Sequence, residues 1–189
     1  MPRASGDLDE ILRLRAADLD LALIALPYDT GELTVRKLFK DEFWFVARAD
    51  DPLASAKEVA MRDLRAGHIV LLEEGHCLRD HAIAACGART ANPESMVEAT
   101  SLHTLLQMVE GGLGATLLPE MTLKAGILNG TDLVARPFST QVPARTIALV
   151  ARPTTAHRGD FDLFADLVIE KSRRVTRTPS RRPPAARPR

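Results

Sequence analysis

LLEEGHCLRDHA, residues 71–82, is the stretch that most constrains the fold of this 189-residue chain. It continues an apolar run, residues 68–72, which is typical of a buried strand. Gly75 follows the run and precedes a segment with helical spacing over residues 76–86. The apolar positions that fall on one face of this helix are Leu78, Ala82 and Ala85. The stretch therefore predicts a strand that leads directly into a helix, the unit from which α/β folds are built.

The same stretch contains Cys77, and the chain has only one other cysteine, Cys86, nine positions later. A thiol reacts as the thiolate, and a helix N-terminus or a neighbouring Arg or His lowers the pKa of a cysteine. Cys77 has His76 and Arg79 as neighbours. Three acidic residues nearby oppose the shift: Glu73, Glu74 and Asp80. We expect Cys77 to be the more reactive thiol.

Helix geometry separates the two cysteines. Nine steps of about 1.5 Å place their Cα atoms roughly 13 Å apart, whereas a disulfide needs Cα atoms within about 7 Å. If Cys77 is oxidised to a sulfenic acid and Cys86 attacks it, the helix between them must unwind. This pattern indicates a redox switch.

Other interpretations stay open on the residues alone. Two cysteines are often inert, small apolar side chains. His76, Cys77, His81 and Cys86 are all residue types that bind zinc. However, adjacent helix residues diverge by about 100° and structural zinc sites usually pair cysteines two to four residues apart. We therefore expect no metal and no cofactor, and we interpret His81 as a solvated helix residue.

Composition and charge narrow the class of protein. With 46% hydrophobic residues the chain can form one domain or two small ones. Residues 171–189 carry eight Lys or Arg and no acid, which leaves 17 basic against 25 acidic residues before them. The Pro- and Arg-rich segment 174–189 is expected to be a disordered basic tail. No run approaches the roughly 20 apolar residues that span a bilayer, and no signal peptide is recognised, so we expect a cytoplasmic protein.

Strands and helices are predicted to alternate along the chain. Strands are expected at residues 20–26, 33–39, 43–48, 68–72, 96–99, 115–118, 132–137 and 146–150. Helices are expected at residues 7–17, 57–64, 76–86, 102–110, 120–128 and 160–171. Ser101 is placed to cap the fourth helix, and the last helix is expected to use Phe161, Phe164, Leu167 and Val168 as its apolar face. Strands separated by helices predict a parallel sheet.

Several blocks carry a family resemblance. LLEEGHCLRDHA, with a second cysteine nine positions after the first, resembles the peroxide-sensing segment of the OxyR group of LysR-type transcriptional regulators. ATSLHTL at residues 99–105, GATLLP at 114–119 and RTIALVARP at 145–153 are similar to later blocks of that family, in the same order. The resemblance covers most of residues 7–170.

The resemblance implies a periplasmic-binding-protein-like α/β fold with two Rossmann-like subdomains joined by crossing strands. Residues 1–42 and 146–173 would form the first subdomain, and residues 43–145 the second, with the sensor. The crevice between them is the family's effector site. A winged helix-turn-helix, a linker helix and the first strand and helix of the first subdomain have no counterpart here, so the chain is expected to be truncated at its N-terminus.

For function, the resemblance implies a peroxide-sensing regulatory domain, not an enzyme, switched by a reversible Cys77–Cys86 disulfide. Its partners would be hydrogen peroxide and a glutaredoxin- or thioredoxin-type reductant, with DNA, RNA polymerase and a homo-oligomeric state belonging to the full-length regulator. The implied sensor pocket consists of His76, Arg79, Asp80, Thr100, Ser101 and Arg145. Arg145 would stabilise the thiolate or the leaving hydroxide, although an arginine at a strand end is ordinarily solvated.

Two further classes of function remain. The first is a LysR-type domain that binds a small organic effector and has non-redox cysteines. The second is an enzyme of the thiol peroxidase type.

Overall fold

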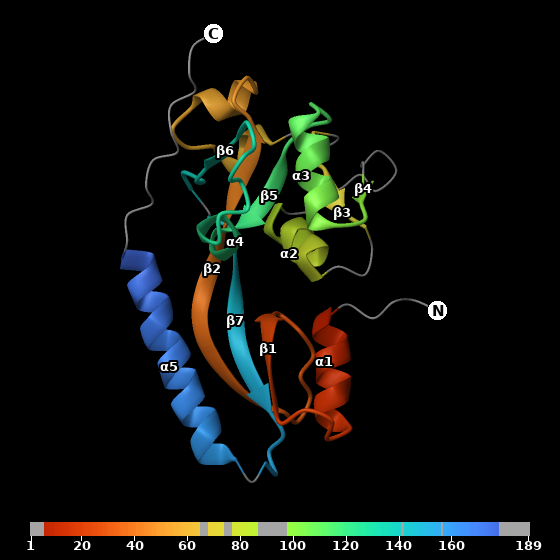
Figure 1. The fold of residues 1–189 in the computed structure, drawn as a ribbon, viewed down its shortest axis with the longest axis vertical. Coiled ribbons are helices and arrows are strands. Elements are labelled where there is room, and N and C mark those ends of the chain that lie inside the picture. Colours follow the sequence, from red (N-terminus) through yellow and green to blue (C-terminus); the bar gives the residue numbers. More distant parts are fainter. Residues whose placement is uncertain are drawn as a thin grey trace.

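The structure, a computed structural model, describes residues 6–64, 68–73, 77–86, 98–140, 142–155 and 157–177. Two antiparallel strands, β2 (Thr34–Arg48) and β7 (Ala144–Ala151), connect the two ends of the molecule. Figure 1 shows β2 over most of the height of the molecule, with helices on either side. These two strands therefore form the frame on which the other elements are placed.

β2 is one strand where the sequence predicts two, over residues 33–39 and 43–48. The residues between them, Lys40, Asp41 and Glu42, all pair with β7. β2 then changes partners, because residues 43–48 pair with β5 (Thr116–Pro119) and β6 (Leu133–Arg136). The expected break is wrong because Asp41, a residue type that favours turns, is held in the strand by its ion pair with Arg145 across from it on β7.

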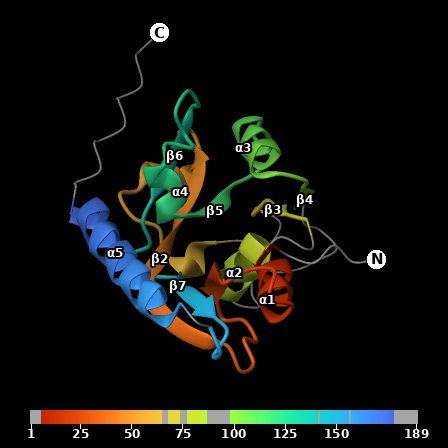
Figure 2. The same ribbon diagram turned by 60° about the horizontal axis from the view of Figure 1, so that its bottom comes forward.

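The sheet at one end of the molecule has the order β1-β7-β2, with β1 (Leu21–Leu26) antiparallel to β7. It has a helix on each face, as Figure 2 shows: α1 (Gly6–Arg15) on one and α5 (Arg158–Arg177) on the other. Successive β7 residues belong to opposite cores. Leu149 packs with Phe161 and Ala165 of α5, while Val150 packs with the α1 side chains Ile11 and Leu14.

The other end of the molecule repeats this two-sided packing. Phe45 and Leu117 belong to one core, and Val46 and Leu118 belong to the other. Around them lie α3 (Leu102–Glu110), α4 (Glu120–Lys124) and a two-stranded parallel sheet of β3 (Leu71–Leu72) and β4 (Glu98–Ala99). The helix predicted over residues 57–64 is wrong, since only short 3-10 turns form, at Pro52–Ser55 and Met61–Asp63.

The predicted parallel sheet is mostly wrong as well. In the described part of the chain, only the β3–β4 pair and two isolated bridges are parallel, and the strands around β2 and β7 are antiparallel. Alternation of strands and helices predicts a parallel sheet only when consecutive strands are neighbours. Here the strands that pair with β2 are β5, β6 and β7, which come late in the sequence.

α5 is longer than predicted, and only part of its expected apolar face is buried. Phe161 and Ala165 are buried, whereas Phe164 is 39% and Leu167 49% exposed. Arg36 of β2 binds the backbone and carboxylate of Asp162 and the carboxylate of Asp166, which fixes the helix on the sheet. Within the described ranges, no helix combines the length and apolarity needed to cross a membrane.

Candidate functional site

The two cysteines are the first and last residues of one helix, α2 (Cys77–Cys86), which confirms the predicted helix. Ala82 is buried in the core beneath it, and Leu78 and Ile83 are half-buried against the same core. Asp80 and Ala84 are exposed. The side chains of both cysteines, and all of His76, lie outside the described residues. The structure does show that the two cysteines are separated by the length of the ten-residue helix, since they are its first and last residues.

Arg79 attaches α2 to its neighbour. Its side chain is buried, and its Nη2 lies 2.8 Å from Oε1 of Glu98 on β4. Glu98 is partly exposed, so the pair lies at the edge of the core. His81, expected to be solvated, is only 6% exposed. The expectation that His81 is solvated is wrong, because the buried side of α2 includes the polar residues Arg79 and His81 as well as Ala82.

β4 leads directly to two of the predicted pocket residues. Ser101 is the N-cap of α3, as predicted, and its Oγ accepts a hydrogen bond from the backbone N of Thr104 at 3.1 Å. Thr100 is exposed in the connection between β4 and α3. The backbone N of Glu73 donates to the carbonyl of Ala99 at 3.0 Å, which joins the strand before α2 to the strand before α3. Arg79, Thr100 and Ser101 therefore share one neighbourhood through β4.

Arg145 lies on β7, directly across from Asp41 of β2. Its Nη2 and Nε are 3.0 Å and 3.1 Å from Oδ2 of Asp41, a carboxylate that is only 2% exposed. The other oxygen, Oδ1, accepts the backbone N–H of Met121 in the first turn of α4 at 3.0 Å. Sδ of Met121 is 3.5 Å from Nη2 of Arg145. This half-buried arginine is thus the partner of a buried carboxylate near the point where β2 changes its strand partners, and not the solvated strand-end charge that position alone favours.

Sequence reasoning missed Asp41 and Glu98, the acidic partners of the two predicted arginines. Asp41 lies between residues that read as strand ends, and no local pattern distinguishes it from a solvated acid. The signal that would have found it is its place directly across from Arg145, which requires the register of β2 against β7. Glu98 is two residues before Thr100 and gave no signal of its own.

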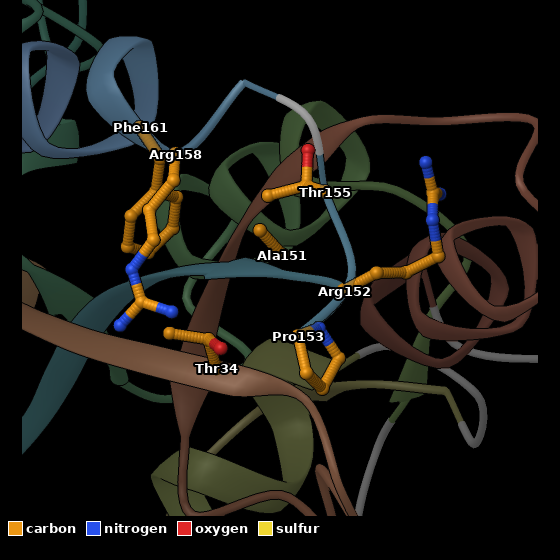
Figure 3. A pocket seen from close by; sticks show the side chains of 7 residues that line it. All are labelled: Thr34, Ala151, Arg152, Pro153, Thr155, Arg158 and Phe161. Atoms are coloured by element: carbon orange, nitrogen blue, oxygen red, sulfur yellow. The ribbon is translucent and has the colours of Figure 1, made fainter.

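One shallow pocket, of about 180 Å³, lies at the end of the molecule where α5 begins. It is lined by Thr34, Ala151, Arg152, Pro153, Thr155, Arg158 and Phe161, and Figure 3 shows that Arg152 points away from it. The guanidinium of Arg152 binds the carbonyls of Leu14 and Leu19 and the carboxylate of Asp20. That volume includes open solvent, and the space available to a water-sized molecule is only about 10 Å³, so the pocket is a weak candidate for a ligand site.

Comparison with known families resolves the class of the fold. Residues 4–173 match the LysR substrate binding domain. The chain belongs to this family. The LysR substrate-binding domain is the regulatory part of LysR-type transcriptional regulators, in agreement with the resemblance seen in the sequence and with the mixed α/β architecture.

Relatives of this LysR domain include regulators named for peroxide. It is 36% identical over 161 residues to a hydrogen peroxide-inducible genes activator of Dickeya chrysanthemi, covering 85% of this chain and 52% of that protein. It is 36% identical over 166 residues to the HTH-type transcriptional regulator EstR of Acinetobacter baylyi, covering 88% and 54%. The chain therefore spans about half the length of the curated relatives that it matches.

Solved structures of OxyR regulatory domains have the same fold. The reduced regulatory domain of OxyR2 from Vibrio vulnificus aligns with a TM-score of 0.74 and 35% identity, covering 86% of this chain and 76% of that one. The reduced OxyR regulatory domain from Pseudomonas aeruginosa aligns with a TM-score of 0.74 and 30% identity, covering 95% and 79%. Both likenesses support the placement of this LysR domain beside the OxyR group.

Proposed function

We propose that this chain is the peroxide-sensing regulatory domain of a LysR-type transcriptional activator, switched by a reversible disulfide between Cys77 and Cys86. One observation carries the proposal: the only two cysteines of the chain are the two ends of a single helix in a LysR substrate-binding domain. The names of the peroxide-inducible relatives support it.

The proposed chemistry is one oxidation per sensing event. The thiolate of Cys77 attacks one oxygen of hydrogen peroxide, the O–O bond breaks, and hydroxide leaves with a proton from His76 or water. The resulting sulfenic sulfur is attacked by the thiolate of Cys86, which forms the S–S bond and releases the second hydroxide, protonated to water. A glutaredoxin- or thioredoxin-type dithiol then reduces the disulfide.

The switch follows from the length of α2. Its two ends are roughly 13 Å apart along the axis, well beyond the about 7 Å that a disulfide permits between Cα atoms. Bond formation therefore requires α2 to unwind, which exposes Leu78 and Ala82 and separates Arg79 from Glu98. In the reduced state Arg79, and by our proposal Asp80, hold the helix in place.

The other pocket residues have supporting roles in this proposal. Thr100 and Ser101, which follow β4, would line the approach of the peroxide. The stabilisation of thiolate or hydroxide by Arg145 stays a prediction, and in the described contacts its guanidinium is held by Asp41. We further propose subdomains at residues 1–42 with 146–173 and at 43–145, supported by the change of partners that β2 makes at residue 43.

The full-length protein would act as a cytoplasmic homo-oligomer that binds DNA and contacts RNA polymerase. These activities are proposed for the full-length regulator, because the chain spans about half the length of the curated relatives that it matches. This chain would supply the part that senses peroxide.

Thiol counting after one equivalent of hydrogen peroxide tests the proposal. We expect loss of both thiols and a mass decrease of two hydrogen atoms in intact-protein mass spectrometry. Cys77→Ser should abolish the change, and Cys86→Ser should leave a sulfenic acid that dimedone traps. Retention of both thiols would favour an organic-effector domain, and sustained peroxide consumption with a reductant would favour an enzyme. Ala84→Ser, which adds a hydroxyl at an exposed position of the same helix and keeps both thiols, is the matched control and should behave as wild type.

A further inference from the structure

Met121 is the most exposed methionine in the described part of the chain. It is 45% exposed and lies at the start of α4, whereas Met61 and Met108 are half-buried against the cores of that end of the molecule. A methionine is oxidised at its sulfur to the sulfoxide, and a sulfur that solvent reaches is open to the oxidant. Met121 therefore presents a sulfur atom that the proposed cysteine chemistry does not use.

An arginine N–H group lies beside this sulfur. Nη2 of Arg145 is 3.5 Å from Sδ of Met121 and 3.0 Å from Oδ2 of Asp41. Nη2 has two hydrogens, so it can donate one to the buried carboxylate and direct the other toward the sulfur. The backbone N–H of Met121 donates to the other oxygen of the same carboxylate at 3.0 Å. Asp41 therefore holds both the guanidinium and the main chain of Met121 in place, side by side.

A guanidinium in this position favours the oxidised sulfur over the reduced one. A thioether is only a weak hydrogen-bond acceptor, so the N–H of Arg145 gains little from it. When a peroxide transfers an oxygen atom, negative charge develops on the oxygen that leaves. A charged donor stabilises that oxygen more than it stabilises the thioether, and such a difference accelerates a reaction. The sulfoxide oxygen of the product is also a better acceptor for the same N–H group.

We propose that Met121 is a second site of oxidation by hydrogen peroxide, at which Arg145 assists the transfer of oxygen and then binds the sulfoxide. The sulfur attacks one oxygen of the peroxide and gives up two electrons, so that the S–O bond forms and the O–O bond breaks. The leaving hydroxide accepts a hydrogen bond from Nη2 of Arg145 and takes the proton of the transferred oxygen. The products are methionine sulfoxide and water, and sulfoxide reductases restore the methionine.

The site lies near the junction between the two ends of the molecule. Asp41 and Arg145 face each other across β2 and β7, two residues before β2 changes its partners. A sulfoxide bound by Arg145 adds a hydrogen bond between α4 and these strands, whereas a sulfoxide without a partner disrupts packing. Oxidation should therefore slow amide hydrogen exchange at Ala125, whose N–H is bonded to the carbonyl of Met121, by about fivefold.

The rate of oxidation at Met121 tests the proposal. The chain carries Cys77→Ser and Cys86→Ser, so that thiols consume no peroxide and the result does not depend on the proposed disulfide. Peptide mapping by mass spectrometry follows the gain of one oxygen under excess hydrogen peroxide. Met121 in the chain should be oxidised about tenfold faster than the methionine of a synthetic peptide of residues 116–126. Exposure alone predicts the opposite order, because the peptide is fully solvated.

Two further variants separate the effect of the arginine from that of exposure. Leu167→Met is the matched control, because position 167 is 49% exposed on α5 and none of the residues three or four positions away is an arginine. Its sulfur should be oxidised no faster than the peptide. Arg145→Lys keeps a cation opposite Asp41 but lacks the planar group that directs a second N–H at the sulfur. It should lower the rate at Met121 to that of the peptide.

The contrary results are equally specific. A rate at Met121 that does not exceed that of the peptide would overturn the proposal, and this measurement needs no substitution near Asp41. An Arg145→Lys chain that melts as the parent chain does, yet oxidises Met121 at the parent rate, would also overturn it. Exchange at Ala125 that is unchanged or faster after oxidation would show that Arg145 does not bind the sulfoxide.

Discussion

α2 and α5 are both amphipathic helices on a sheet, yet their supports differ greatly. α5 is 20 residues long and rests on β2 and β7, the longest strands of the molecule. α2 is ten residues long and lies by β3, which has two residues and pairs with another two-residue strand. A helix with few supports opens at low cost in free energy. We therefore expect the helix that carries both cysteines to be able to unfold without the frame.

The side chains that anchor α5 are also more deeply buried than most of those that anchor α2. Phe161 and Ala165 of α5 are buried in a core shared with all three strands of their sheet. α2 buries Ala82, a small side chain, and only partly buries Leu78 and Ile83. Apolar burial contributes about 25 cal/mol per Å², so the smaller side chains of α2 contribute much less. We therefore expect unfolding of α2 to be local and loss of α5 to be global.

The largest effect is expected from Phe161→Ala. Deleting a buried phenyl ring leaves a cavity between α5 and the sheet and should lower the free energy of unfolding by about 3–5 kcal/mol. Urea titration followed by circular dichroism measures this. Leu163→Ala, on the exposed side of the same helix, should change the value by less than about 0.5 kcal/mol. If both substitutions lowered the free energy of unfolding equally, Phe161 would not be the residue that anchors α5 to the frame.

Glu98→Gln tests whether α2 opens independently. It removes the charge that faces the buried guanidinium of Arg79 and should cost about 1–2 kcal/mol, because one partner remains buried. Amide hydrogen exchange in residues 78–84 should become about tenfold faster, while exchange in β7 changes little. Glu58→Gln, the same change at an exposed site outside α2, is the control. Equal acceleration of exchange in α2 and β7 would show that α2 unfolds together with the frame.

A smaller effect is expected from Arg36→Met. Arg36 binds Asp162 and Asp166 of α5, but these carboxylates are 56% and 69% exposed. Solvent screening limits such pairs to about 1 kcal/mol or less. The loss should shrink further as salt is raised, in chemical denaturation at two ionic strengths. A cost above about 3 kcal/mol would mean that charge, and not apolar burial, anchors α5.

The smallest effect is expected at Asp50, away from both helices. A hydrogen bond from Arg48 and its charge hold the pKa of Asp50 below its ordinary value of 3.8. The group thus contributes stability that is present above pH 3.8, and that is lost as the pH falls through the lower, folded-state pKa. Asp50→Asn should slightly flatten the pH dependence of unfolding in that acidic range only. A change at neutral pH that exceeds the Arg36→Met effect would contradict this ranking of charges.

Local patterns predicted the elements that have local causes. The helix between the cysteines, and α3 with its Ser101 cap, follow from apolar spacing and from a side chain that satisfies a free N–H group. The resemblance of LLEEGHCLRDHA also placed the chain in the LysR family correctly. These features depend on residues close together in the sequence.

Pairing between distant segments was not predictable in the same way. The continuity of β2 depends on Asp41 meeting Arg145, 104 positions later. The outward direction of Phe164 and Leu167 depends on which side of α5 the strands occupy. The burial of His81 depends on what surrounds α2. Each is a long-range fact, and a single sequence carries little information about register between distant strands.

β2 belongs to both sheets, and after the register shift in its pairing with β7, between Lys37 and Phe39, its side chains share one alternation as far as Arg48. A single inserted or deleted residue near Lys40 would rotate every following side chain to the wrong face, and Phe45 and Val46 would exchange cores. Natural length variation in this family should therefore fall in the connections and leave this strand at constant length, so the strand provides a fixed reference for aligning distant members.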